Sequence, residues 1–377
     1  MTLNNSLPMT LALLLTLSAS AGAHAVTLTD RLERPSAMTP RALQSPLSDV
    51  QSVGDRQVMV GASGHILLRD ANGQVQQAQV PVDLLLTAVQ FVDADHGWAV
   101  GHDGVVLHSN DGGHTWRKQL DGRQINPLLV KAAEADVARV EQAVDAAPDD
   151  ERLATALDNA HFAMDDAQAA TDAGPARPLL GLWFRNAHEG WVVGAYGLLL
   201  KTVDGGATWE VVSGLDNPDR LHLNSVLGLA DGSLLVAGEA GRLYRSGDGG
   251  THWDAARQPT DASIYSLAEL KNGDVMAAGF GGTLLVSHDH GATWTARQLP
   301  LKTSLYGIKQ LSSGAVVVAG QAGSLQFSED AQQFAVWRAP GKAALLNVSE
   351  TRTGQLLLVG SAGLQVLPMV PFKVQTK

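Results

Sequence analysis

The pattern Gly-x-x-Gly recurs along this chain at a nearly constant interval. It occurs at Gly61/Gly64, Gly101/Gly104, Gly194/Gly197, Gly238/Gly241, Gly279/Gly282, Gly320/Gly323 and Gly360/Gly363, with spacings of 40, 93, 44, 41, 41 and 40 residues. Short apolar runs such as 98–100, 316–318 and 356–358 lie beside the pairs. Runs of this length bounded by Gly, Asp and Ser are typical of β-strands. A period near 40 residues indicates a four-stranded unit repeated around a ring rather than a helical repeat.

A second motif, Ser/Thr-x-Asp-Gly-Gly-x-Thr-Trp, follows several of these pairs. It is complete at 109–116 and 202–209, carries His252 in place of Thr at 246–253, carries His290 in place of the first Gly at 287–294, and decays at 328–337. We interpret it as a tight turn between antiparallel strands, because Asp accepts backbone N–H bonds, Gly adopts positive φ and Trp covers the turn. The predicted structural residues are Asp111, Trp116, Asp204, Trp209, Asp248, Trp253, Asp289 and Trp294. Their turn role leaves no reason to expect catalysis from these aspartates.

The two motifs together predict an all-β, seven-bladed β-propeller of four-stranded antiparallel blades over residues 26–377. Without residues 1–25 and an insertion described below, seven units have about 43 residues each, within the roughly 40–45 of a four-stranded blade, whereas six would need about 50. A propeller must close its ring or leave a sheet edge open. Because Pro368 and Pro371 interrupt the C-terminal residues, we expect a segment within Val26–Gln44 to supply the outer strand of the last blade.

The one long interval, 93 residues, contains an insertion at 125–178 between blades 2 and 3. Its apolar residues follow helical spacing in two runs, which are Val130, Ala133, Val137, Val140, Val144 and then Leu153, Leu157, Ala160, Met164, Ala167. This spacing predicts a helical hairpin whose second helix begins at an Asp cap before Glu151.

The N-terminal residues and the composition indicate where the protein is located and which classes of partner it can bind. Residues 1–25 resemble a secretory signal peptide, with an apolar run from Leu11 to Leu17 and cleavage expected near Ala25. No later run reaches the roughly 20 apolar residues of a membrane span, so we expect a periplasmic protein that does not itself cross the membrane. With no cysteine, disulfides and thiol chemistry are excluded. The net charge of −11 argues against nucleic acid as a partner.

The repeats resemble those of a known family. Val89 to Asp93 and Gly97 to Gly101, followed by Gly104 and the Asp-Gly-Gly-x-Thr-Trp motif, are similar to the repeat of the photosystem II stability/assembly factor-like propellers within the BNR or Asp-box group. Residues 182–184 and 190–194, continuing to Trp209, repeat the pattern. The resemblance implies a non-catalytic periplasmic or lumenal propeller, without a cofactor, that holds a membrane protein or its precursor during assembly. Similar propellers often accompany RND-type exporters, and the arginine-rich patch of photosynthetic members has no obvious counterpart here.

The propeller topology predicts where partners bind. In a four-stranded blade the Gly-x-x-Gly turns and the connections between blades share one face, so the hairpin should lie among these turns, on a rim suited to binding. The candidate contacts are His102, Tyr196, Glu239 and Phe280 in the turns, and Asn224, Tyr265, Tyr306 and Asn347 at the mouth of the central channel. The alternative is that these residues only cover the tops of the blades.

The hairpin is strongly acidic, with 11 acidic and four basic residues. A two-helix arm of this charge suits a basic partner surface. The candidate contacts are Glu134, Asp136, Glu141, Asp158 and Asp165. The alternative is a solvated charged face on a hairpin whose apolar stripes pack against each other.

Metal binding and glycoside hydrolysis both have little support in the sequence. Ser287-His288-Asp289-His290 does not supply a closed metal-ligand set, so no metal site is expected there. A sialidase-like glycoside hydrolase also fits Asp-box turns, but its chemistry needs an arginine triad and a Tyr activated by a Glu, and Phe184-Arg185-Asn186-Ala187 only partly matches the corresponding signature. We therefore predict a monomeric, non-enzymatic binding protein of a membrane complex in the cell envelope.

Overall fold

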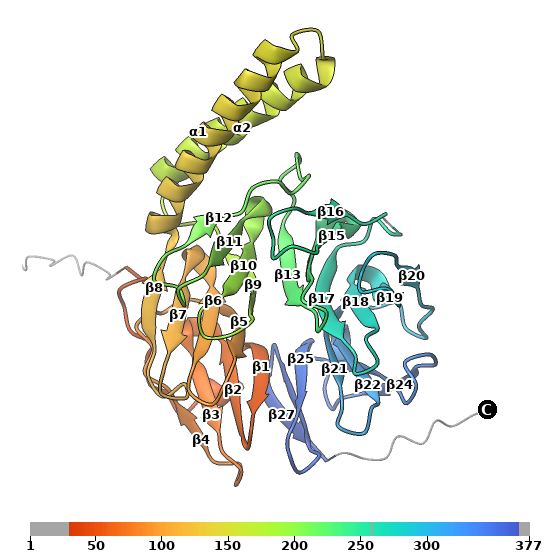
Figure 1. Cartoon of the computed structure of the whole chain (residues 1–377). Helices are drawn as coiled ribbons and strands as arrows, with labels where there is room; N and C mark the ends of the chain where they lie inside the picture. Colours follow the sequence, from red (N-terminus) through yellow and green to blue (C-terminus); the bar gives the residue numbers. More distant parts are fainter. Residues whose placement is uncertain (1–29, 258, 369–377) are drawn as a thin grey trace, which may run out of the picture.

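The computed structural model describes residues 30–257 and 259–368, and the predicted signal peptide with its cleavage site near Ala25 lies outside them. Figure 1 shows seven sheets arranged around a central axis, with a helical hairpin projecting from one face. The first strand of each sheet contacts the first strands of both neighbouring sheets, and β1 of the first sheet contacts β25 of the last. The ring is therefore closed, and the predicted seven-bladed propeller with an inserted hairpin is confirmed.

Blades 1 to 3 each contain four antiparallel strands in sequence order. Blade 1 consists of β1 (Leu47–Val53), β2 (Arg56–Gly61), β3 (Ile66–Arg69) and β4 (Val75–Gln77). Blade 2 consists of β5 (Leu86–Phe91), β6 (Gly97–Gly101), β7 (Val106–Ser109) and β8 (Arg117–Leu120). Blade 3 consists of β9 (Leu179–Phe184), β10 (Gly190–Gly194), β11 (Leu199–Thr202) and β12 (Glu210–Val211).

Blades 4 to 6 repeat this order, and the seventh blade differs. Blade 4 consists of β13 (Leu223–Gly228), β14 (Leu234–Gly238), β15 (Leu243–Ser246) and β16 (Asp254–Ala255). Blade 5 consists of β17 (Ile264–Glu269), β18 (Val275–Gly279), β19 (Leu284–Ser287) and β20 (Thr295–Ala296). Blade 6 consists of β21 (Leu305–Gln310), β22 (Val316–Gly320), β23 (Ser324–Ser328) and β24 (Ala335–Arg338). Blade 7 consists of β25 (Leu345–Glu350), β26 (Leu356–Gly360) and β27 (Gly363–Leu367).

The core lies between neighbouring blades. The second strand of every blade carries apolar residues on both faces, as in the run Leu356 to Val359, and these side chains are buried. A strand buried on both faces reads as a continuous apolar run rather than an alternating one. Trp98 and Trp191 occupy the same position in β6 and β10 and are fully buried. The apolar runs noticed in the sequence are therefore the central strands of the blades.

The predicted closure of the last blade is wrong for the described residues. Blade 7 has three strands, and the described part of the predicted segment, residues 30–44, forms no strand. Its 3₁₀ turn η1 (Ala42–Gln44) packs against β27, where a Cβ on Gly363 would lie 2.0 Å from the Leu43 carbonyl oxygen. Earlier in this segment, Leu32 is buried in the core of blades 1 and 2, and the Ser36 amide donates to the Val80 carbonyl at 3.0 Å. The segment is therefore bound across blades 1, 2 and 7 as irregular chain.

Two long helices form the inserted hairpin. Helix α1 (Gly122–Ala146) begins three residues before the predicted insertion, at the capping box of Asp121 and Gln124. Helix α2 (Glu151–Ala173) begins at the predicted cap, where the Asp150 carboxylate accepts from the Arg152 amide at 3.0 Å. The predicted apolar stripes face inward, and none of their side chains is exposed. None of the described helices combines the length and the apolar character needed to cross a membrane.

Candidate partner-binding face

The two motifs of the sequence lie on opposite faces of the ring. Asp-box turns pack against the loops between the first and second strands of their blades. The Gly112 amide donates to the Asp95 carbonyl at 3.1 Å, and the Gly205 amide donates to the His188 carbonyl at 2.8 Å. The Gly-x-x-Gly turns connect the other ends of the second strands. Helix α1 contacts one of these turns, η3 (His102–Gly104), and also β12. The hairpin therefore projects from the Gly-x-x-Gly face, as Figure 1 shows.

The Asp-box turns of blades 2, 3 and 5 are held by the same set of hydrogen bonds. In blade 3, the Thr202 hydroxyl donates to Asp204 at 2.8 Å and accepts from the Gly206 amide at 2.8 Å. The Thr208 amide and hydroxyl donate to the same carboxylate at 2.9 and 2.6 Å. These bonds lower the pKa of Asp204 to about 2, with those from Thr208 making the largest contribution. The carboxylate is fully used in the turn.

The two departures from the motif keep its geometry. His252, which replaces Thr, places its Nδ1 2.6 Å from Asp248 and donates its amide to the same carboxylate at 2.9 Å. His290, which replaces Gly, has φ of +55°, while Gly112, Gly205 and Gly249 at this position have φ of +74°. The covering tryptophans Trp116, Trp209, Trp253 and Trp294 are all buried. The turn thus tolerates these changes because its bonds rest on the carboxylate and the backbone.

The Gly-x-x-Gly turns form one short 3₁₀ turn in each of blades 1 to 6. They are η2 (Ala62–Gly64), η3, η4 (Ala195–Gly197), η5 (Glu239–Gly241), η6 (Phe280–Gly282) and η7 (Gln321–Gly323). The first glycine allows the start of the first strand of the same blade to lie close by, since a Cβ on Gly238 would lie 2.4 Å from the His222 carbonyl oxygen, just before β13. The predicted contacts His102 and Phe280 are exposed in these turns, and Tyr196 is 52% exposed with φ of +57°.

A chain of polar contacts joins blade 4 to the base of the hairpin. The His222 Nδ1 lies 3.1 Å from Glu239, and its ring lies 5.1 Å from the ring of Tyr196. On the other side of Tyr196, the Arg177 guanidinium lies 5.0 Å from the ring centre. Arg177 in turn forms an ion pair with Asp166 of α2. The structure thus connects two predicted contact residues, Tyr196 and Glu239, through residues that were not predicted.

The central channel brings together the four other predicted contacts. Asn224, Tyr265, Tyr306 and Asn347 line one cavity of about 270 Å³ near the start of the first strands. The pairing register skips one residue at these starts, and Asn224, Tyr265 and Tyr306 are the skipped residues. Such bulges re-aim a side chain out of the ladder. The rings of Tyr265 and Tyr306 lie 5.6 Å apart.

Two of these channel residues join neighbouring blades. The Asn224 amide donates to the Ile264 carbonyl of blade 5 at 2.9 Å. The Asn347 amide donates to the carboxylate of Asp49 in blade 1, which also accepts from the amides of Val89 and Val50, each at 2.8 Å. Burial raises the pKa of Asp49 above its ordinary value despite these bonds. Asn224 and Asn347 therefore have a structural role that the sequence did not indicate.

The outer surface of α2 carries a regular acidic stripe. Glu151, Asp158, Asp165 and Asp172 recur every seven residues, and all four are exposed. Seven residues make nearly two helical turns, so these side chains lie along one line. Phe162 lies between the second and third of them and is 65% exposed. On α1, Glu134 and Glu141 are exposed, whereas Asp136 pairs with Arg139.

The residues considered for a metal are engaged with carboxylates of neighbouring loops. His288 Nδ1 lies 2.7 Å from Asp274, and His290 Nδ1 lies 3.9 Å from Asp231. Within the described ranges, no group of three or more His, Asp or Glu side chains is arranged to hold a metal ion.

Comparisons with known proteins give the class and then the family. The fold and turns define an Asp-box seven-bladed propeller. The family model described as photosynthesis system II assembly factor YCF48 matches residues 68–134 and 169–258. The matched repeats are thus similar to those of this family, in agreement with the resemblance seen in the sequence. The interval between the two matched segments, 135–168, is the distal part of the hairpin.

One relative shows the same similarity over part of the chain. The photosystem II assembly lipoprotein Ycf48 of Synechococcus sp. (strain CC9902) is 26% identical over 178 residues, which are 46% of this chain and 37% of the relative. The chain thus matches little more than a third of that relative's length. Two solved propellers share the fold. A structure described as YCF48 bound to D1 peptide has a TM-score of 0.59 at 15% identity and covers 89% of this chain and 96% of its own. YCF48 from Cyanidioschyzon merolae has a TM-score of 0.60 at 14% identity, with coverages of 88% and 97%.

Proposed function

We propose that this chain is a non-catalytic, exported scaffold that holds a membrane protein of the cell envelope during its assembly. Its similarity to propellers named as assembly factors supports the role, and one of these was solved with a D1 peptide. Periplasmic location follows from the predicted signal peptide. The partner docks on the Gly-x-x-Gly face, with the acidic hairpin as the principal contact. An RND-type exporter is one such partner suggested by the sequence resemblance.

The observation that carries this proposal is the attachment of the hairpin at both of its ends. At the start of α1, Arg123 pairs with Asp30 and Glu33 of the N-terminal segment, and Lys118 pairs with Asp121 at 2.9 Å. Near the end of α2, Asp166 pairs with Arg177 and with Arg220 of the loop before blade 4. Two separate anchors fix the direction of a two-helix arm. A fixed arm presents its surface without the ordering cost that a tethered one would incur on binding.

The exposed acidic stripe on α2 gives the hairpin a negatively charged surface that can bind a partner. Four carboxylates in line attract a basic surface and speed its approach. Phe162 in their midst supplies the apolar contact on which interface energies commonly depend. A periplasmic loop of a membrane protein that combines basic and apolar residues would complement this surface.

The sialidase-like alternative is less well supported by the channel. The described residues that line its cavity include two tyrosines and the carboxylate of Asp49, but no arginine. Asp49 is held by three hydrogen bonds within the ring. A carboxylate-binding arginine triad therefore has no counterpart at that position. Turnover of aryl sialosides that is lost in Tyr265→Phe or Tyr306→Phe would favour the alternative.

Removing the hairpin tests the proposal. Gly122 and Pro175 are in contact, since a Cβ on Gly122 would lie 2.6 Å from the Pro175 Cβ, so a short Gly-Ser bridge can replace the residues between them. The shortened protein should keep the β-rich circular dichroism spectrum of a propeller. In a pull-down from detergent-solubilised envelope, it should lose the membrane protein that the full chain recovers.

A charge variant separates the stripe from the arm as a whole. Asp158→Asn with Asp165→Asn should weaken recovery of the partner. The difference in recovery between the wild type and this variant should become smaller as the salt concentration rises, because salt screens the wild-type attraction. The matched control is Asp254→Asn with Glu329→Gln, which removes two exposed charges from blades 4 and 6, away from the hairpin. Equal recovery by the shortened protein and the full chain would refute the docking role of the hairpin.

A further inference from the structure

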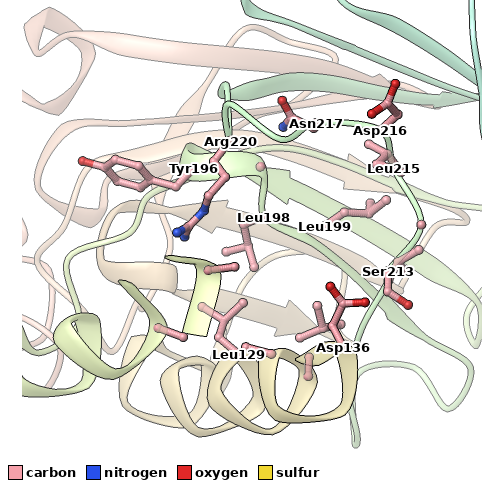
Figure 2. Close-up of a pocket in the computed structure, with 18 of the residues that line it drawn as sticks. Leu129, Asp136, Tyr196, Leu198, Leu199, Ser213, Leu215, Asp216, Asn217 and Arg220 are labelled. Carbon is pink, nitrogen blue, oxygen red and sulfur yellow. The ribbon is translucent and has the colours of Figure 1, made fainter. Parts of the chain in front are cut away.

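A second feature of the hairpin is the cavity beneath it. A cavity of about 380 Å³ lies between the hairpin and the outer part of blade 3 (Figure 2). Leu129 and Ala163 contribute to it from the two helices, and Leu198, Leu199 and Leu215 from the blade and the loop that follows. Its volume falls in the range of about 300–1,000 Å³ typical of small-molecule sites. Apolar side chains thus line the cavity on the side of the helices and on the side of blade 3.

Two arginines that share one carboxylate partner line this cavity. Arg177 and Arg220 both line it and both donate to the same oxygen of Asp166. Burial raises the pKa of Asp166, but the bonds from the two guanidiniums outweigh burial and leave the pKa below its ordinary value, so the carboxylate is charged. One carboxylate between two guanidiniums leaves a net positive charge. Arg177 is only 7% exposed, and its buried Nε has no hydrogen-bond partner in the structure.

The other charged groups of the lining do not cancel this charge. Asp136 forms an ion pair with Arg139 on α1, so that pair is neutral. In Figure 2 the Arg220 guanidinium is directed into the cavity, whereas the Asp216 carboxylate points away from it. Arg220 is thus a cationic group that a ligand in the cavity would meet, alongside the neutral pair of Asp136 and Arg139.

The loop that carries Arg220 is fixed in an unfavourable backbone conformation. Arg220 has φ of +53°, a left-handed geometry that is unfavourable for a residue with a side chain. The Arg220 amide donates to the Asn217 carbonyl at 3.0 Å, and the Asn217 side chain bonds both main-chain groups of Leu221, at 3.0 and 3.1 Å. The loop therefore holds the guanidinium at the mouth of the cavity.

We propose that this cavity binds a medium-chain fatty acid, with the apolar chain between α1, α2 and blade 3 and the carboxylate on Arg220 and Arg177. Apolar walls with one cationic end complement an apolar chain with one anionic end. Guanidinium groups also suit carboxylates, because they donate two parallel hydrogen bonds. Asp136 and Ala163 of the lining lie in the interval 135–168 that the family model leaves unmatched, so the site depends on this chain's own insertion.

Calorimetry on the full chain with decanoate, below its micellar concentration, tests the proposal. Decanoate should bind one site per chain, and 1-decanol, which has the same chain without the charge, should bind at least tenfold more weakly. Arg220→Gln should lose about tenfold or more in affinity for decanoate, since it removes a charged hydrogen-bond donor. Arg297→Gln, on blade 5 away from the hairpin, is the matched control and should bind as the wild type does.

A second variant tests the cavity itself. Ala163→Leu keeps both arginines and fills part of the space, so it should abolish decanoate binding while the melting temperature stays close to that of the wild type. Equal affinity for decanoate and decanol, or decanoate binding that neither Arg220→Gln nor Ala163→Leu changes, would overturn the proposal. The measurement needs no membrane partner, so its outcome is independent of the scaffold function.

Discussion

The Asn347 amide of blade 7 donates to the Asp49 carboxylate of blade 1, across the point where the ends of the ring meet. The two residues are 298 positions apart in the sequence. Nearby, the Ser52 hydroxyl of blade 1 lies 2.9 Å from the Ser349 hydroxyl of blade 7 and donates to the Glu350 carbonyl at 2.8 Å. In the described residues, side-chain contacts between the first strands of blades 1 and 7 thus join the ends of the ring.

Removal of this contact should destabilise the ring more than removal of a comparable one elsewhere. Asn347→Ala leaves the buried Asp49 carboxylate with one bond fewer, which should cost about 1–3 kcal/mol of unfolding free energy. Asn224→Ala removes a bond to a backbone carbonyl at a similar channel position and should cost about 0.5–1.5 kcal/mol. Urea unfolding of both variants measures the difference. A smaller loss for Asn347→Ala than for Asn224→Ala would contradict the role of this contact.

A glycine at position 290 should stabilise the protein. His290 adopts φ of +55° at the turn position where three other blades carry glycine. His290→Gly relieves this conformation, which should add about 0.5–1 kcal/mol to the free energy of unfolding. Loss of the weak contact between the His290 ring and Asp231 should offset a small part of this gain. The bond from Arg245 Nε to the residue 290 carbonyl, 3.0 Å long, uses only the backbone and should persist. The melting temperature should rise by a few degrees, and a fall would show that the ring contact matters more than the backbone.

The stability that the Asp-box carboxylates provide should disappear in acid. The folded pKa of Asp204 is about 2, below the ordinary value of 3.8, so its contribution is complete above pH 4 and is lost as the pH falls towards 2. Melting temperatures of the wild type and of Asp204→Asn should differ at pH 7, and the gap should narrow between pH 4 and 2. A gap that stays constant down to pH 2 would show that the bonds do not depend on the charge. Binding of the membrane partner should be unaffected at neutral pH.

The repeated part of the fold was predictable because one backbone requirement recurs in each blade. The first glycine of each Gly-x-x-Gly pair lies where the backbone at the start of the same blade's first strand passes too closely for a Cβ, as at Gly238. The Asp-box residues likewise form local hydrogen bonds within four positions, as Asp204 with Thr208 does. Local requirements of this kind appear in the sequence as fixed spacings. The apolar periodicity of the hairpin was readable for the same reason.

The ring closure and the partner-binding face depend on contacts between residues that are far apart in the sequence. Such contacts leave no regular spacing from which they could be predicted. The N-terminal segment was expected to form a strand, but its bonds to Val80 and its packing on β27 join distant parts of the chain. Tyr196 and Glu239 were predicted separately, while His222 and Arg177, which connect them, come from an irregular loop and from the end of the insertion. Asn347 was assigned to the channel mouth, yet its partner Asp49 could be identified only once the ring was closed.

Photo-crosslinking in the native envelope tests the central claim that the hairpin face docks a membrane protein. Phe162 on the hairpin and Val203 in an Asp-box turn on the opposite face are exposed to 65% and 62%, so a photoreactive amino acid at either position samples solvent to a similar degree. The account predicts that the reagent at position 162 captures an integral membrane protein and that the reagent at position 203 does not. Capture of the same protein from position 203 alone, or equally from both positions, would contradict it.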